Sequence, residues 1–159
     1  MINADAKKPD ITTRSVDKND LPILIQMVYK LAAYHGDQAT LTQEQLGNDL
    51  FGKNRWIFAL VAEIDKQVVG YSVICPLIRL QFGSRGAEIH HLYVEELYRR
   101  CGVGASLVIA TQAQACELGC DFMTVGTHPD NTGAQEFYLS HGYTQRQSSF
   151  PKFRINLKP

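Results

Sequence analysis

Long apolar runs and an excess of charge of one sign are both missing from this sequence. No stretch approaches the roughly 18 consecutive apolar residues that a membrane-spanning helix needs, so we expect no membrane segment. Lysine and arginine together number 16, as do aspartate and glutamate, and the formal net charge is zero. We therefore expect no nucleic-acid partner, although a local basic cluster can still bind an anion.

Cysteine is also scarce, and none of the cysteines is spaced for a metal or redox site. Cys75, Cys101, Cys116 and Cys120 form no Cys-x-x-Cys pair. Cys116 and Cys120 lie one helical turn apart, but no histidine or second pair completes a metal-ligand set. We expect free thiols, no bound metal and a reducing, cytoplasmic location.

What remains is the composition of an ordinary globular domain. A chain of 159 residues is long enough for one hydrophobic core, and 45% apolar residues is a usual content. The polar N-terminus lacks an apolar signal core, so residues 1–10 are expected to be a flexible lead-in. No repeat or linker divides the rest, and we expect a single domain over residues 11–159.

The periodicity of the apolar residues predicts both helices and strands. Strands are predicted at residues 11–16, 56–64, 68–80, 87–94 and 121–128, and helices at 20–34, 42–51, 102–119 and 129–142. Residues 143–157 are expected to supply one or two last strands. The prediction is a mixed α/β fold with one central, mostly antiparallel sheet of about six or seven strands and flanking helices.

Two local signals refine this pattern. Thr42 and Gln45 are spaced as a capping box at the start of the second helix. Pro76 cannot donate to a strand ladder, so it predicts a bulge or an edge position within its strand.

A basic, glycine-containing segment joins the strand that ends at Val94 to the helix predicted from Gly102. The N–H groups of a helix's first turn have no partner within the helix, and the helix dipole there favours a negative group. Glycines let a large anion approach the backbone, and Arg99 and Arg100 can add charge-assisted hydrogen bonds. The segment predicts a pyrophosphate site, although a plain glycine-rich helix entry is the alternative. It matches neither the P-loop nor the Rossmann fingerprint.

Two motifs together resemble the GNAT superfamily of acetyl-coenzyme A-dependent N-acetyltransferases. Arg99-Arg100-Cys101-Gly102-Val103-Gly104 matches the family's Arg/Gln-x-x-Gly-x-Gly/Ala signature and follows Leu92-Tyr93-Val94. Asn131-Thr132-Gly133-Ala134-Gln135-Glu136-Phe137-Tyr138, followed by Gly142-Tyr143, matches its second motif. The resemblance covers residues 11–157 and implies a GNAT-like fold, acetyl-CoA as co-substrate and direct acetyl transfer without an acyl-enzyme.

The resemblance also implies roles for individual residues. Five backbone N–H groups would bind the pyrophosphate, with Arg99 and Arg100 beside it. They are those of Cys101, Gly102, Val103, Gly104 and Ala105. The backbone of Leu92, Tyr93 and Val94 would pair with the pantetheine arm like an added strand and polarise the thioester carbonyl. Asn131 would contact the pantetheine. Tyr138 would protonate the departing thiolate, the alternative being a plain core residue.

Residues 31–52 further resemble the diamine and polyamine acetyltransferase branch. That branch typically carries a Glu-Asp pair where this sequence has His90-His91. The expected acceptor is a primary amine of a small molecule, of diamine or polyamine type. The alternatives are a peptide or protein amine, and a catalytically silent acyl-CoA-binding module. The resemblance also implies a homodimer formed through late strands, where Phe150, Phe153, Ile155 and Leu157 recur.

An amine acceptor arrives protonated, because its pKa is roughly 10.4, so a base must remove the proton before attack. Alternation along residues 87–94 places Glu88, His90 and Leu92 on one face of the strand, and Ile89, His91 and Tyr93 on the other. Glu88 and His90 are the candidate base and its partner, with water as an alternative. The competing roles are structural for the histidines and an ion pair with Arg79 for Glu88.

The amine site has three candidate residues where the first predicted helix breaks. These are Tyr34, His35 and Asp37. An ordinary solvated loop is the alternative.

Overall fold

The computed structural model of the protein describes residues 9–147 and 152–157. The chain divides into two compact units, Met1–Gly126 and Thr127–Pro159. The predicted lead-in at residues 1–10 lies outside the described residues, except for Pro9 and Asp10. Phe150, one of the apolar residues expected at a dimer contact, also lies outside them.

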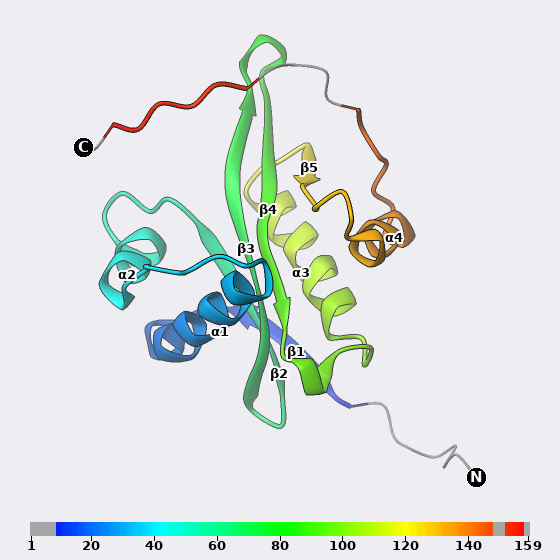
Figure 1. Ribbon diagram of the computed structural model, residues 1–159. Coiled ribbons are helices and arrows are strands. Elements are labelled where there is room, and N and C mark those ends of the chain that lie inside the picture. The colour runs from blue at the N-terminus through cyan, green and yellow to red at the C-terminus, as the bar shows by residue number, and fades with distance from the viewer. Residues whose placement is uncertain (1–8, 148–151, 158–159) are drawn as a thin grey trace. The chain divides into compact units, whose positions relative to one another are not determined.

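The first unit contains a single mixed sheet of five strands in the order β1-β2-β3-β4-β5 (Figure 1). The strands are β1 (Ile11–Ser15), β2 (Phe58–Ile64), β3 (Gln67–Arg79), β4 (Ser84–Val94) and β5 (Phe122–Val125). The first four are antiparallel and β5 is parallel to β4. The predicted mixed α/β class and mostly antiparallel sheet are confirmed.

The predicted count of six or seven strands is wrong. Residues 143–147 and 152–157, expected to supply the last strands, form none. Recurring apolar residues are only a local signal, whereas a strand exists only where a second segment accepts its hydrogen bonds.

Helices cover both faces of the sheet (Figure 1). α1 (Leu21–Tyr34) and α2 (Gln43–Phe51) lie on one face, and α3 (Val103–Glu117) lies on the other. Short 3-10 turns span Lys18–Asp20, Leu80–Phe82 and Glu96–Tyr98. The predicted capping box is present, since Thr42 and Gln45 each accept from the other's backbone N–H. The second unit contains α4 (Thr132–Ser140).

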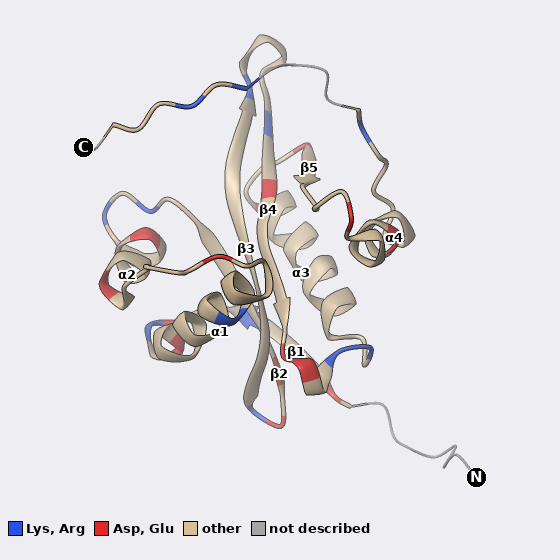
Figure 2. Cartoon of the chain, viewed as in Figure 1, with Lys and Arg blue, Asp and Glu red and all other residues tan. Residues whose placement is uncertain are grey.

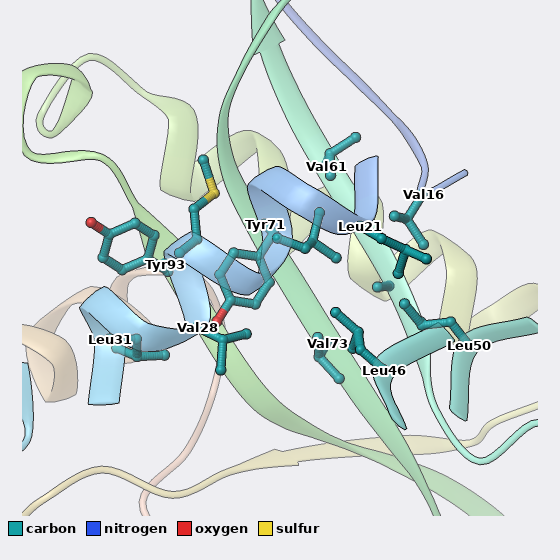
Figure 3. Close-up of a cluster of buried hydrophobic side chains, with 13 residues drawn as sticks. Val16, Leu21, Val28, Leu31, Leu46, Leu50, Val61, Tyr71, Val73 and Tyr93 are labelled. Atoms are coloured by element: carbon teal, nitrogen blue, oxygen red, sulfur yellow. The ribbon is translucent and has the colours of Figure 1, made fainter. Parts of the chain in front are cut away.

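Two apolar clusters hold these layers together. The larger lies between the sheet and α1 and α2, and it includes the fully buried Tyr71 beside Tyr93 (Figure 3). The smaller joins α3, through Val103 and Leu107, to the other face of β2 and β3. Every strand of the sheet's centre is therefore buried on both faces.

The hairpin of β3 and β4 extends beyond its neighbour β2, which pairs with β3 only as far as Ile74. Pro76 faces Ala87 of β4 and lies in this one-sided part, so its predicted edge position is confirmed. No helix in the described part of the chain is long and apolar enough to cross a membrane.

Candidate active site

Strand β4 carries a one-residue bulge at His90. Val73 of β3 lies opposite His91, and the next residue, Ile74, lies opposite Ile89. His90 is therefore the extra residue, and an extra residue in one strand reverses the alternation of side chains beyond it.

The bulge removes Leu92 from the predicted group of Glu88, His90 and Leu92, whereas Glu88 and His90 stay on one face of the sheet. Glu88 lies opposite Cys75 of β3, and Cys75 is two residues from Val73. Glu88, Cys75 and Val73 therefore lie on the same face of the sheet. Val73 packs under α1 and α2. Leu92 instead packs against the cluster on the α3 face. Strict alternation could not anticipate this, because a bulge depends on the partner strand.

Three histidines meet on the α1 and α2 face. The rings of His90 and His91 stack with centroids 4.6 Å apart, so both point to the same side of the sheet. His35, just after α1, is close enough to act on the charge of His91. The ring of Tyr34 stands edge-on to His35 at 5.5 Å. We call His35, His90 and His91 the histidine cluster.

The structure thus brings two of the three predicted amine-site residues to the predicted histidines. Asp37 does not join them. Its backbone N–H donates to the Ala32 carbonyl, and no contact that we find in the described residues links its exposed side chain to the histidine cluster.

His91 is held by a tyrosine that the sequence did not single out. The Tyr71 hydroxyl lies 3.0 Å from Nδ1 of His91. Burial, followed by the charges of His90 and His35, lowers the pKa of His91 to about 4. Burial raises the pKa of Tyr71 well above its ordinary value. Both side chains are therefore neutral at pH 7. Tyr71 is 20 residues from His91, and no local pattern marks the pair.

Glu88 has no ion-pair partner among the described residues, so the alternative pairing with Arg79 is not formed. Arg79 lies opposite Ser84, and its guanidinium stands over the rings of Phe82 and Phe122. The half-buried Glu88 instead lies beside Cys75, where burial and this carboxylate raise the pKa of the thiol.

The end of β4 is tied to α1 by charged groups. Lys30 and Glu95 form an ion pair at 2.6 Å, and the Tyr93 hydroxyl donates to the same carboxylate. Nε of Arg99 donates to the Val94 carbonyl at 3.0 Å. The Arg99 guanidinium lies 5.8 Å from the ring centroids of both Tyr34 and Tyr93. Both arginines are exposed, and Arg99 is the one with contacts to the strand end.

The start of α3 has the features of an anion site. Gly102 holds the N-cap position with a φ of 96°, and no side chain caps the helix. The first hydrogen-bonded N–H is that of Ser106, which donates to Gly102. The N–H groups of Gly104 and Ala105 have no acceptor that we find within the described chain, and they remain available for a pyrophosphate.

An open strand edge leads toward this helix end. β5 pairs with β4 only over Gly86–Ile89. The Glu95 N–H donates to Val69 of β3, so by alternation Leu92 and Val94 direct their backbone groups to the opposite edge. Arg99 occupies the Val94 carbonyl, and we find no partner for the backbone of Leu92 or the Val94 N–H within the described residues. This edge fits the pantetheine pairing expected there, with the backbone of Tyr93 engaged by β3 instead.

The second unit holds the other two predicted residues. Oδ1 of Asn131 accepts from the Ala134 N–H at 3.1 Å and caps α4, a role that an asparagine before a helix could have predicted. Tyr138 is buried, with the rings of Phe137 and Tyr143 within 5.4 Å. Burial, and then Tyr143, raises the pKa of Tyr138 to about 12, so this phenol is protonated at pH 7.

The sequence led us to expect no bound metal, which would need side-chain ligands. The four cysteines are free. No three His, Cys, Asp or Glu side chains gather as a metal-binding group within residues 9–147 and 152–157.

Comparison with known proteins identifies the family. The model of the Acetyltransferase (GNAT) family matches residues 26–143. The chain belongs to the GNAT acetyltransferase family. A thialysine N-epsilon-acetyltransferase of Sus scrofa is 26% identical over 142 residues, which are 83% of each chain. The match to the family and to such relatives identifies this protein as an acetyl-CoA-dependent N-acetyltransferase.

Solved GNAT structures share its fold. An aminoglycoside acetyltransferase from an uncultured soil metagenomic sample, in complex with trehalose, is 25% identical with a TM-score of 0.75 over 93% of this chain and 97% of its own. AAC(6')-Iy in complex with a bisubstrate analogue, CoA-S-monomethyl-acetylneamine, has the same TM-score of 0.75 at 18% identity, over 92% and 99%. These solved acetyltransferases and this chain therefore share a mixed α/β fold, which has a five-stranded sheet in the described part of this chain.

Proposed function

We propose that this GNAT N-acetyltransferase transfers the acetyl group of acetyl-CoA directly to a primary amine of a small molecule. The observation that carries the proposal is the arrangement along β4. Its open edge leads to the uncapped start of α3, and its α1 and α2 face carries His90, His91 and Glu88, a carboxylate with no ion pair among the described residues. The resemblance of residues 31–52 to the diamine branch, and the relative that acts on thialysine, support a small amine.

The groups described for the site have separate roles in this reaction. The N–H groups at the start of α3 would hold the pyrophosphate, and the free edge of β4 would hold the pantetheine arm. His90, exposed and on the same face as Glu88, takes the proton that the ammonium must lose. The C–N bond then forms as the C–S bond breaks, and the protonated phenol of Tyr138, the acid that the family resemblance implies, donates a proton to the leaving sulfur. The second proton that the acylated nitrogen must lose then restores the phenol.

The first test is release of free thiol from acetyl-CoA with a panel of acceptors. The panel contains diamines, polyamines, lysine analogues, an aminoglycoside and peptides with a lysine or a free N-terminus. We expect transfer to at least one small amine, with the acetylated product seen by mass spectrometry. Transfer to peptides alone would replace this proposal with the peptide-amine alternative.

The proton donor is tested by Tyr138→Phe. We expect turnover to fall by about 10²-fold or more, the range of a general acid, while acetyl-CoA binding measured by calorimetry survives. Tyr29→Phe is the matched control, because Tyr29 is an exposed tyrosine of α1 whose hydroxyl donates to the Leu41 carbonyl. Unchanged turnover in Tyr138→Phe would remove this residue from the mechanism.

A further inference from the structure

The hydroxyl of Tyr71 decides which nitrogen of His91 carries the proton. Tyr71 is fully buried in the cluster of Figure 3, and the partner of its hydroxyl is Nδ1 of His91. A buried phenol needs an acceptor for its proton, and Nδ1 is the acceptor we find for it within the described residues. Tyr71 therefore donates, Nδ1 accepts, and the neutral ring carries its hydrogen on Nε2.

This tautomer makes His91 a fixed hydrogen-bond donor. Its Nε2–H has no acceptor that we find among residues 9–147, and the ring is only half-buried, so a substrate can reach it. A nitrogen that already carries hydrogen cannot take a proton from an ammonium group. His91 therefore differs in chemistry from its neighbour His90, although their rings stack.

The charged side chains around the histidine cluster also bear on which substrate can bind there. The guanidinium of Arg99, over Tyr34 and Tyr93, has no carboxylate within ion-pair distance in the described part of the chain. Glu95 is already paired with Lys30 and bonded by Tyr93. Acidic residues lie mostly on the helices and turns of the first unit (Figure 2). Glu88 is the one carboxylate of β4, and we find no ion pair for it in residues 9–147 and 152–157.

These groups suit a molecule with one ammonium group and one oxygen acceptor. A polyamine would direct its second ammonium at an N–H donor whose charged neighbours are His90 and His35 rather than a carboxylate. We propose that the acceptor amine carries a carboxylate or hydroxyl oxygen at its other end, and that Nε2–H of His91 donates to this oxygen. The inference rests on the proposed function, because it specifies the amine that the enzyme acetylates.

Three amines of similar length test it: 6-aminohexanoate, 5-aminopentan-1-ol and cadaverine, which end in a carboxylate, a hydroxyl and a second ammonium. We expect kcat/KM for 6-aminohexanoate to exceed that for cadaverine at least tenfold. An equally good alcohol identifies the oxygen as the feature recognised, and a poor alcohol identifies the negative charge. Equal or better use of cadaverine overturns the inference and leaves the proposed function intact. No transfer to any amine overturns both.

Variants of His91 tie the preference to this residue. His91→Leu should lower the ratio of kcat/KM for 6-aminohexanoate over cadaverine at least tenfold. His91→Gln, whose amide N–H can replace Nε2–H, should restore the ratio to within about threefold. If His91 were instead the catalytic base, both substitutions would abolish activity. If His91→Leu does not fold because Tyr71 loses its acceptor, Tyr71→Phe with His91→Leu removes both polar groups and gives the same comparison.

Nitrogen-15 NMR gives a readout that is independent of activity. We expect the Nε2 resonance of His91 to be that of a protonated nitrogen at pH 7, and the Nδ1 resonance that of an unprotonated one. The reverse pattern would show that Tyr71 accepts, and it would overturn the inference.

Discussion

At the scale of single residues, neighbouring histidines of one strand have different environments. His90 is the bulged residue and is exposed, whereas His91 is half-buried and hydrogen-bonded by Tyr71. Burial disfavours an imidazolium at His91, and it lowers the pKa of that ring. The same residue type therefore supplies a candidate base at one position and a neutral donor at the next.

The base is tested by the pH dependence of kcat/KM. His90→Gln should lower kcat/KM by about 10²-fold and remove the acidic limb of the profile, because the group that must be unprotonated is gone. Glu88→Gln should keep that limb. If His90→Gln keeps it and Glu88→Gln loses it, the base is Glu88. If both variants keep it, water is left as the base.

Protonation of His91 should cost stability as the pH falls. Its pKa is about 4 in the folded protein, below the 6.5 of an ordinary histidine. Above pH 6.5 the ring is neutral in both states. Between about 6.5 and 4 the unfolded chain binds a proton that the folded chain does not, so the free energy of unfolding falls. The charges of His90 and His35 add to this effect, because they repel a protonated ring at His91.

Urea unfolding measures the effect. From pH 7.5 to pH 5 the wild type should lose about 1–2 kcal/mol more than His91→Gln, a value reduced for solvent screening at a partly exposed ring. The comparison cancels the carboxylates that both proteins share. An equal loss in both proteins would contradict a depressed pKa at His91.

At the scale of elements, the site depends on where regular structure stops. β5 ends early and leaves an edge of β4 open, the bulge redirects His90, and α3 begins without a side-chain cap. In each case a backbone or side-chain group remains available that regular pairing would have used. These irregularities separate the coenzyme side of β4 from its acceptor side.

The start of α3 can be tested with the glycine at its other end as the control. Gly102 and Gly119 both have positive φ values, 96° and 76°, so alanine at either should cost about 1 kcal/mol of stability. A Cβ at Gly119 meets nothing within 4 Å. We expect only Gly102→Ala to weaken acetyl-CoA binding, by about tenfold or more in calorimetry. Equal affinity in both variants would place the pyrophosphate elsewhere.

At the scale of the whole molecule, the distribution of apolar surface bears on assembly. Phe153, Ile155 and Leu157 are 95%, 81% and 91% exposed. Large exposed apolar side chains that recur in one segment are typical of an interface. We propose that these residues belong to a homodimer contact, as the family resemblance suggested.

Sedimentation velocity tests the assembly. The wild type should sediment as a dimer, and Phe153→Ser combined with Ile155→Ser should dissociate it at least tenfold more readily. Ile109→Ser is the control, because Ile109 is 62% exposed on α3. A monomeric wild type, or a dimer that the double substitution leaves intact, would contradict the proposal.

Much of the architecture was predictable because its signals are local. Helix α1, the capping box of α2 and the edge position of Pro76 follow from neighbours in the chain. The described residues 143–147 and 152–157 do not form the expected strands, because strand formation needs a partner that apolar recurrence does not specify. At the site, the sequence predicted Tyr34, His35 and Asp37 as amine-site residues, and the structure places His35, with Tyr34 against it, close to His91.

The sequence by itself determined the family, the order of the first nine elements and the uncapped, glycine-containing start of α3, since each depends on residues close together in the chain. Tertiary structure decided the rest. The bulge at His90, the proton on His91 and the unpaired state of Glu88 depend on β3 and α1, which are distant in sequence. Side-chain direction and protonation are set by what packs against a residue, and that information exists only in the folded chain.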